Sequence, residues 1–87
     1  MYHVDFTAVA EKQFLKLDKF TQKQLQRYIN KNLNGTTNPR QFGKALHGKF
    51  KGLWRYSVGK YRLVCNIEDS VLKILLVKVG HRRNIYK

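Results

Sequence analysis

The sequence predicts an α/β (α+β) fold in which two N-terminal helices pack on a twisted, mainly antiparallel sheet of about four strands. Three observations predict it. An alternating segment at the N-terminus is followed by two segments with apolar residues at helical spacing, and the C-terminal half combines a hairpin pattern with a long apolar run. Residues 1–87 are expected to form a single domain, because two cores drawn from 87 residues would each be too small to fold alone.

The N-terminal half is predicted to contain one strand and both helices. Residues 2–6, YHVDF, alternate apolar and polar side chains as a half-buried strand does. Thr7 is a suitable N-cap for the first helix, and Thr21 with Gln24 fits a capping box that opens the second. Asn34-Gly35 then ends the second helix. The apolar stripes of the two helices are Ala10, Phe14 and Leu17, and then Leu25, Tyr28, Ile29 and Leu33.

The C-terminal half is predicted to supply the rest of the sheet. Five of the six glycines fall between residues 35 and 59, and the basic stretch before residue 52 is typical of a turn-rich connection. Residues 52–65, GLWRYSVGKYRLVC, have the pattern of a β-hairpin with its turn at Val58-Gly59. After a polar turn at residues 68–70, the apolar run VLKILLVKVG is expected to form a strand at the sheet centre with both faces mostly covered.

The hairpin carries a cluster of cations. A turn at Val58-Gly59 places Arg55 directly opposite Arg62, a like-charge pair that is destabilising by itself. A phosphate bound between the two guanidinium groups would relieve the repulsion, since arginine binds phosphate in bidentate fashion. The same pattern fits solvated charges that extend outward, and a loop of odd length would put the two arginines on different faces. One face of the hairpin is expected to carry Trp54, Tyr56, Tyr61 and Leu63. The other face is expected to carry Arg55, Ser57, Lys60 and Arg62.

The basic tail HRRNIYK is expected to end near the arginine face. It would bring Arg82 to the cluster, with His81 and Tyr86 nearby. On this pairing, replacing Arg62 with alanine should leave the fold intact and the stability unchanged or slightly raised, because it removes like-charge repulsion and no core packing.

Net charge points to a polyanionic partner. Eighteen Lys and Arg stand against five Asp and Glu, a formal net charge of +13. No carboxylate lies between residues 19 and 67, an interval that holds eleven basic residues. Such an imbalance indicates binding to nucleic acid, to an acidic protein, or to both.

Several kinds of chemistry are not supported by the sequence. The three histidines and one cysteine lack metal-ligand spacing, and the scattered carboxylates form neither a two-metal site nor an acid/base pair. No glycine-rich phosphate loop is present. Catalysis would therefore use arginine, lysine, tyrosine or histidine, with no metal and no cofactor.

The sequence predicts a cytoplasmic protein without a membrane partner. It contains no apolar run near the roughly 20 residues of a membrane span, and its N-terminus lacks the layout of a signal peptide. Its one cysteine, Cys65, lies in a strand pattern and is expected to be a buried thiol.

Two stretches together carry a family resemblance. NPRQFGKALHGKFKGLWRYSVGKYRLVC, followed by VLKILLVKVGHRRNIY, resembles the RelE/ParE superfamily of bacterial type II toxins, on the RelE side. The resemblance extends over nearly the whole chain. It implies a ribosome-dependent endoribonuclease that cleaves mRNA in the A site and is neutralised by a tightly bound antitoxin. The implied partners are a cognate acidic antitoxin, the ribosome and mRNA, with operator DNA reached only through the antitoxin.

The resemblance also implies roles for individual residues. Arg62 and Arg82 match the family's phosphate- and transition-state-binding arginines. Arg55 lies where the family has a lysine or arginine beside the scissile phosphate, and Tyr86 matches a C-terminal tyrosine that orients the cleaved nucleotide. Residues expected to bind the substrate are Lys44, Lys49, Lys51, His81 and Arg83.

Some positions depart from the family pattern. Leu53 occupies a position that is lysine in some relatives, which leaves the general base open, and Ser57 and Lys60 replace an arginine and an acidic residue. Lys44, Lys49 or Lys51 are candidate substitutes for the missing lysine.

The sequence is therefore compatible with three functions. The first is a RelE-like mRNA interferase, the second a ParE-like non-enzymatic inhibitor of DNA gyrase on the same fold, and the third a basic RNA-binding module without catalysis. The combination of Arg55, Arg62, Arg82 and Tyr86 favours the first.

Overall fold

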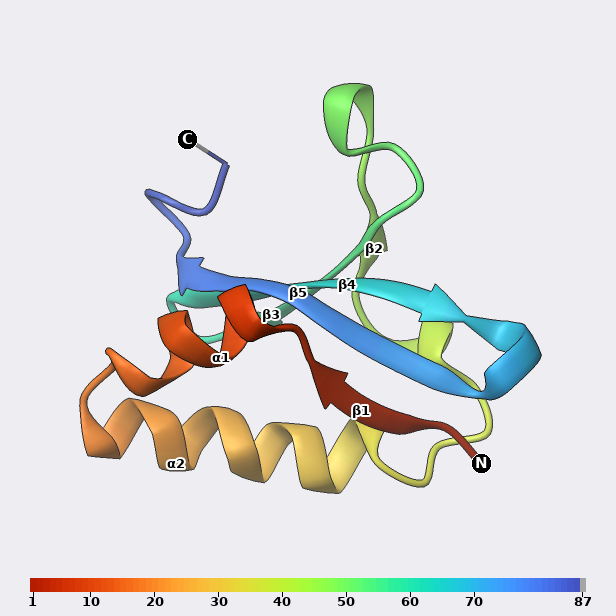
Figure 1. The fold of residues 1–87 in the computed structure, drawn as a ribbon, viewed down its shortest axis with the longest axis horizontal. Coiled ribbons are helices and arrows are strands. Elements are labelled where there is room, and N and C mark those ends of the chain that lie inside the picture. Colours follow the sequence, from red (N-terminus) through yellow and green to blue (C-terminus); the bar gives the residue numbers. More distant parts are fainter. Residues whose placement is uncertain (87) are drawn as a thin grey trace.

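The predicted helices and sheet are present in the computed structural model, which describes residues 1–86 (Figure 1). The helices are α1 (Ala8–Leu15) and α2 (Lys19–Tyr28). The strands are β1 (His3–Phe6), β2 (Lys44–Ala45), β3 (Trp54–Val58), β4 (Tyr61–Glu68) and β5 (Lys73–His81). They form one sheet in the order β1-β5-β4-β3-β2, in which only β1 and β5 run parallel. The predicted fold class is confirmed, with five strands in place of about four.

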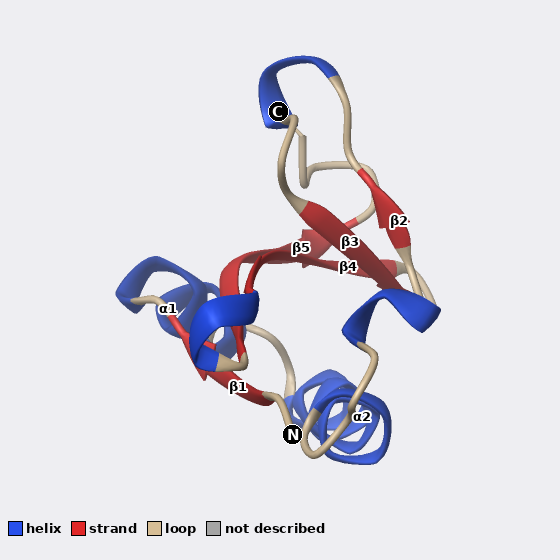
Figure 2. Ribbon diagram, turned by 90° about the vertical axis from the view of Figure 1, so that its right-hand side faces the viewer, coloured by secondary structure: helices blue, strands red, loops and turns tan. Residues whose placement is uncertain are grey.

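Both helices cover the same face of the sheet, here called the helix face (Figure 2). The core lies between the helices and this face of the sheet, and its residues Tyr56 and Leu63 are fully buried. The opposite face, here called the outer face, carries the loop of residues 46–53 and the segment of residues 82–86, which rise together from the sheet (Figure 2). The side chains of the core are Ala10, Leu25, Ile29, Leu33, Tyr56, Val58, Leu63, Cys65, Ile74, Leu76 and Val79.

The helix ends follow local capping chemistry. Thr7 caps α1 as predicted, because its hydroxyl accepts a hydrogen bond from the amide of Ala10. The predicted cap of α2 is wrong: Asp18 accepts from both the amide and the hydroxyl of Thr21, so α2 begins at Lys19. The helix continues as a single π-helical turn, Ile29–Leu33, and ends at Asn34-Gly35 as expected.

No helical segment among residues 1–86 combines the length and the apolar character needed to cross a membrane.

The strand that the sequence pattern did not predict is β2, at the edge of the sheet. It has only two residues, too few for an alternating pattern to stand out within a basic loop. Gly43, directly before it, has φ of 79°, and a Cβ at this position would overlap the carbonyl oxygen of Arg55. Glycine is therefore what allows the chain to approach β3 closely enough to pair.

Strand β5 lies between β1 and β4, so it is interior, but the central strand of the five is β4. The burial of β5 alternates along the strand: Ile74 and Leu76 are buried, while their neighbours are half-buried. A β-bulge at Val77 shifts the alternation by one residue, so that Val79 is again buried. The expectation of a strand with both faces mostly covered is therefore corrected: the helices bury one face, and the other is half-covered.

The hairpin differs from the prediction in its register. The loop is Gly59-Lys60, and Arg62 lies opposite Ser57, while Arg55 lies opposite Val64. Gly59 sets this register because it takes φ of 58° at the first loop position, a conformation that favours glycine. The predicted Arg55–Arg62 pair is therefore wrong, and Lys60 lies in the loop. Each β3 residue pairs two positions further along β4 than predicted, and this even shift keeps the paired side chains on their predicted faces.

Candidate functional site

Four cations share the outer face of the sheet. One row of paired residues crosses four strands from β2 to β5 and consists of Lys44, Arg55, Val64 and Lys78. The next row consists of Ser57, Arg62 and Gly80. Paired residues project from the same side of a sheet. The prediction that Arg55 and Arg62 share a face is therefore confirmed, and Lys44 and Lys78 join them in one cluster, here called the cation cluster.

Two projections, the 46–53 loop and the segment of residues 82–86, rise from the face of the sheet that carries this cluster (Figure 1). The ring of Phe50, in the 46–53 loop, lies 5.4 Å from the ring of Tyr86, centroid to centroid. Ile85 is buried over Gly80, where a Cβ would lie 3.2 Å from the Cδ1 atom of Ile85. The predicted approach of the tail to the arginine face is therefore confirmed. Val64 and Ile85 are both buried without belonging to the core under the helices, so they form a small apolar layer beneath the site.

Two buried polar atoms at this site have no hydrogen-bond partner among residues 1–86: Nε of Arg55 and the hydroxyl oxygen of Tyr86. Buried polar groups are nearly always hydrogen-bonded, so an unpartnered one calls for an explanation. A bound anion that accepts from both groups would supply it.

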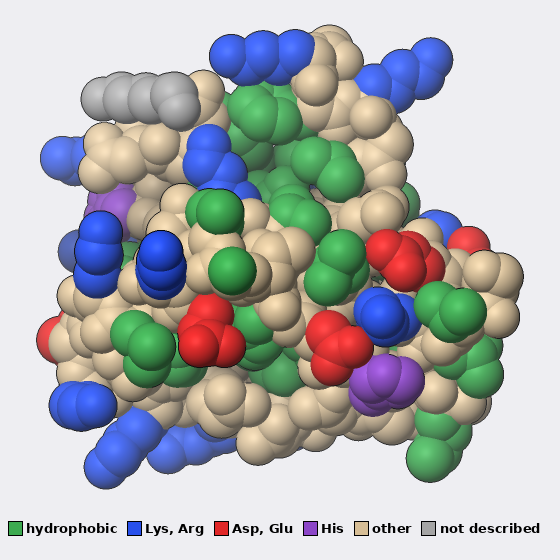
Figure 3. All heavy atoms as spheres, viewed as in Figure 1, with side chains coloured by type: hydrophobic (Ala, Val, Ile, Leu, Met, Phe, Trp, Pro, Cys, Tyr) green, Lys and Arg blue, Asp and Glu red, His purple; other side chains and the backbone are tan. Residues whose placement is uncertain are grey.

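No carboxylate within residues 1–86 forms an ion pair with the cation cluster. Asp69 pairs with Arg40, and Asp5 pairs with Lys73 and His3, all outside the cluster. Figure 3 shows the acidic side chains of this view below the two projections, while basic side chains surround the hydrophobic atoms between them. The cluster therefore keeps its positive charge, which favours an anionic ligand.

Arg62 is tied to the hairpin loop. Its guanidinium donates hydrogen bonds to the carbonyl oxygens of Gly59 (3.0 Å) and Tyr61 (2.9 Å). The amide of Arg82 donates to the carbonyl of Lys60 (2.8 Å), which brings the C-terminal segment to the same loop. The side chains of Arg82 and Arg83 are exposed. The loop therefore gathers Arg62 and Arg82 at one end of the cation cluster.

His81 is separated from Arg55 by the sheet. His81 pairs with Tyr61, and the two rings meet edge-on with their centroids 5.5 Å apart. Because Tyr61 lies on the helix face, His81 lies there as well. Its Nδ1 accepts a hydrogen bond from the amide of Arg83. Desolvation lowers the pKa of His81, and the charges of Arg83, Arg82, Lys60 and Arg62 lower it further. The imidazole is therefore neutral near pH 7, and the low pKa reflects the positive potential at this edge.

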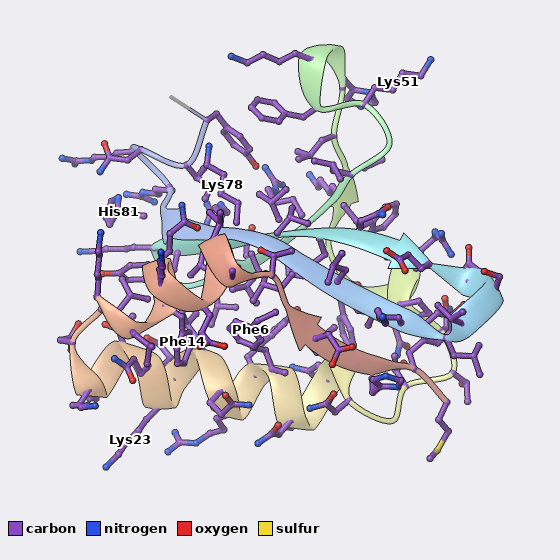
Figure 4. The ribbon with its side chains drawn as sticks, in the orientation of Figure 1. Phe6, Phe14, Lys23, Lys51, Lys78 and His81 are labelled. Atoms are coloured by element: carbon purple, nitrogen blue, oxygen red, sulfur yellow. The ribbon has the colours of Figure 1, made fainter. Side chains whose placement is uncertain are left out.

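The three lysines expected to bind the substrate lie in different places. Lys44 is exposed on β2 beside Arg55. Lys49 is exposed at the tip of the 46–53 loop, with its Nζ 5.3 Å from the ring centroid of Phe50. Lys51 extends away from the sheet (Figure 4). Leu53, at the base of this loop, is half-buried.

Sequence reasoning missed two residues of this site, Phe50 and Lys78. Lys78 rises from β5 on the side of the C-terminal segment (Figure 4), and its Nζ lies 5.8 Å from the ring centroid of Phe50. A lysine inside an otherwise apolar run was the signal for Lys78. For Phe50 there was none, because its contact with Tyr86 joins segments far apart in the sequence.

Other features of the surface lie elsewhere. Residues 1–86 bring no three His, Cys, Asp or Glu side chains together as a metal ion would require. A cavity of about 350 Å³ lies between the π-helical turn Ile29–Leu33 and the loop after it, and Lys31, Thr37 and Phe42 are among its lining residues. None of the predicted site residues lines this cavity.

Fold and site together define a small basic α+β domain with a cation cluster on the outer face of its sheet. Residues 4–86 match the family model described as the ParE toxin of the type II toxin-antitoxin system parDE. The chain therefore belongs to this family, within the RelE/ParE superfamily of type II toxins.

Solved structures agree with this assignment. The toxin–antitoxin complex RelBE2 from Mycobacterium tuberculosis is matched with a TM-score of 0.84 and 27% identity, over 93% of this chain and 98% of that one. The E. coli RelBE complex is matched with a TM-score of 0.74 and 24% identity, over 93% of this chain and 96% of that one. A YoeB/ParE toxin from Agrobacterium tumefaciens is matched with a TM-score of 0.69 and 14% identity, over 91% of this chain and 96% of that one. The latter two show the shared fold. No curated protein is a significant match in sequence.

Proposed function

We propose that this type II toxin is a metal-independent endoribonuclease that cuts mRNA in the ribosomal A site and so stops translation. The observation that carries the proposal is the cation cluster, in which Nε of Arg55 and the hydroxyl of Tyr86 are buried without partners among residues 1–86. A phosphate of RNA placed there would accept from both groups and be neutralised by the surrounding cations.

RNA supplies its own nucleophile for this reaction. The 2′-hydroxyl attacks the adjacent phosphorus, the bond from phosphorus to the 5′-oxygen breaks, and the products are a 2′,3′-cyclic phosphate and a 5′-hydroxyl. Arg55 and Arg62 stabilise the charge that develops on the phosphorane-like transition state, and Arg82 contributes from the C-terminal segment, whose amide bonds to the hairpin loop. Removing one such preorganised donor typically lowers kcat by about 10²–10³-fold.

Tyr86 and the flanking basic residues bind the substrate. The ring of Tyr86 is half-buried beside Phe50, a position from which it can orient the nucleotide at the cleaved bond. Lys44 and Lys49 extend the positive surface on one side, and Arg83 extends it on the other. Lys51 contributes only to the overall field, because it extends away from the site.

The partners follow from the charge and the relatives. The Mycobacterium tuberculosis and E. coli relatives are solved as toxin–antitoxin complexes. An acidic antitoxin suits a chain with a net charge of +13. We infer that it neutralises the toxin, that it alone contacts operator DNA, and that the ribosome provides the RNA geometry for cleavage.

Inhibition of DNA gyrase is a second candidate function. The matching family model describes ParE toxins, and this observation favours it. A gyrase inhibitor would not need the partnerless Arg55 and Tyr86 groups, whereas an RNA-cleaving site would use both.

The test is to add the purified toxin to translating ribosomes and to map the new mRNA ends, with a DNA supercoiling assay of gyrase in parallel. Codon-phased cuts that end in a 2′,3′-cyclic phosphate are expected. Arg55→Ala should reduce the cleavage rate by about 10²–10³-fold, while Arg27→Ala, an equal charge change on the exposed side of α2, should not. Intact mRNA with inhibited supercoiling would contradict the proposal and support the second function.

A further inference from the structure

Lys78 is a charged residue in an apolar strand. It is half-buried, and it forms no ion pair with a carboxylate of residues 1–86. Partly burying an ammonium group without such a partner is unfavourable. The ring of Phe50, 5.8 Å from Nζ, is a cation–π contact that only partly compensates.

The bulge in β5 is what directs Lys78 to the outer face. Ile74 and Leu76 face the helices, and uninterrupted alternation would turn residue 78 toward the helices as well. The extra residue at Val77 reverses the alternation, so that Lys78 pairs with Val64 on the outer face. Bulges of this kind often redirect a side chain next to a functional site.

Lys78 and Arg55 lie on either side of Val64 in one row of paired residues. Their backbones are two strand spacings apart, about 10 Å, so the two long side chains can meet over Val64. The contact between Phe50 and Tyr86 borders the same place, because the Phe50 ring touches both Tyr86 and the Lys78 ammonium.

We propose that Lys78 is a further phosphate-contacting residue of this site. Its ammonium and the Arg55 guanidinium bind one RNA phosphate from opposite sides, and Phe50 is a positioning residue that holds Lys78 beside Tyr86. The inference rests on the proposed function in taking RNA as the ligand. If Lys78 only covered Val64, an uncharged side chain of similar length would serve equally well, which makes Lys78→Met the informative variant.

The first measurement is RNA binding without cleavage. A short 2′-O-methyl RNA, which lacks the nucleophile, is titrated with the purified toxin over a range of salt concentrations. Lys78→Met should weaken binding and reduce the slope of log Kd against log salt by about 0.7, the value for one contact to a single strand. Lys78→Arg should keep the wild-type slope.

Lys73→Met is the matched control. Lys73 begins the same strand, its side chain is 33% exposed, and it pairs with Asp5 at the end of β5 away from the site. It makes the same change in net charge. Equal slopes for Lys78→Met and Lys73→Met would overturn the proposal, as would a Lys78→Arg protein as defective as Lys78→Met.

The role of Phe50 is tested by combining variants. Phe50→Leu should weaken RNA binding by itself but add little when Lys49 and Lys78 are both replaced with methionine, because the Phe50 ring contacts both ammonium groups. Additive losses would contradict the positioning role. Thermal melts of each variant confirm that the compared proteins are folded.

The second measurement is cleavage on ribosomes, where Lys78→Met should lower kcat by about 10²-fold and Lys73→Met should leave it unchanged. If the wild-type protein binds RNA with a Lys78-dependent salt slope but leaves mRNA intact, the inference on Lys78 stands and the proposed function fails. If mRNA is cut and Lys78→Met cuts at the wild-type rate with an unchanged slope, the proposed function stands and the inference on Lys78 fails.

Discussion

Arg62 combines a structural contact in the hairpin with a proposed role in the site. Its guanidinium binds two carbonyl oxygens of the hairpin loop, and the same loop holds the amide of Arg82 through Lys60. These bonds fix the guanidinium at the edge of the cation cluster. Because Arg62 lies opposite Ser57, relief of repulsion from Arg55 is not a reason for Arg62→Ala to be stabilising.

Arg62→Ala should therefore have two separate effects: it should destabilise the protein and strongly reduce mRNA cleavage. Loss of the two hydrogen bonds should lower the free energy of unfolding by about 1–3 kcal/mol, and loss of the cation should lower mRNA cleavage by about 10²–10³-fold. Urea denaturation and the ribosome assay measure the two effects, with Arg27→Ala as the control. Wild-type cleavage by a folded Arg62→Ala protein would rule out the phosphate-binding role.

At the scale of elements, short connections decide how the site is assembled. Strand β2 has only two residues, yet it brings Lys44 beside Arg55. Gly43 allows this pairing, because any Cβ there would overlap Arg55 and come within 3.0 Å of both Trp54 and Tyr56. The edge of the cluster therefore depends on a glycine outside it.

Gly43→Ala should destabilise the protein by about 2 kcal/mol or more, because it combines backbone strain with a steric clash. Gly48→Ala is the matched control: Gly48 lies in the following loop at φ of 65°, and a Cβ added there would meet no heavy atom within 4 Å. That substitution should cost about 1 kcal/mol, from strain alone. Chemical denaturation compares the two, and equal losses would refute a clash at Gly43.

A second connection joins three elements through Asp69. Its carboxylate accepts a bidentate pair of hydrogen bonds from Arg40 (3.0 Å each) and one from the hydroxyl of Tyr2. These contacts link the residue before β1, the turn Pro39–Gln41 and the turn between β4 and β5. The Arg40 hydrogen bonds, followed by that of Tyr2, lower the pKa of Asp69 to about 2.

This lowered pKa predicts a loss of stability in acid. In the unfolded chain the carboxyl has a pKa of about 3.9, so the unfolded state binds the proton first as the pH falls. The stabilisation by Asp69 is complete above about pH 4 and is lost as the pH falls to about 2. Melting temperatures from pH 2 to 6 should show a steeper acid decline for the wild type than for Asp69→Asn. Parallel curves would show that Asp69 does not contribute.

On the scale of the whole molecule, charge and fold are arranged independently. The helices bury one face of the sheet, while the outer face keeps its cations without ion pairs to the carboxylates of residues 1–86. With a net charge of +13, the molecule produces a positive field well beyond the site. The proposed acidic antitoxin would be attracted by this field before it makes specific contacts.

Association with an acidic antitoxin segment should therefore depend on salt mainly through its rate. The association rate constant should fall steeply as sodium chloride rises from about 50 to 500 mM, because the Debye length shortens. The dissociation rate constant should change much less. Stopped-flow mixing measures both, and an association rate independent of salt would contradict electrostatic steering.

The sequence by itself determined the order of the main elements and the face on which each hairpin residue lies. Both follow from local rules: side chains repeat every two residues in a strand and every 3.6 in a helix. This is why Arg55 and Arg62 were assigned to one face even though their pairing was wrong. The net charge, the absence of carboxylates from residues 19–67, and the family resemblance also needed no coordinates.

Only the tertiary structure decided the register, the edge strand and the composition of the site. Gly59 selected a loop one residue later than expected, and the bulge at Val77 moved Lys78 from one face to the other. Phe50 meets Tyr86 because the 46–53 loop and the C-terminal segment rise from the same face. Such contacts join residues far apart in the chain, and they depend on positive backbone dihedral angles and bulges that an apolar pattern does not encode.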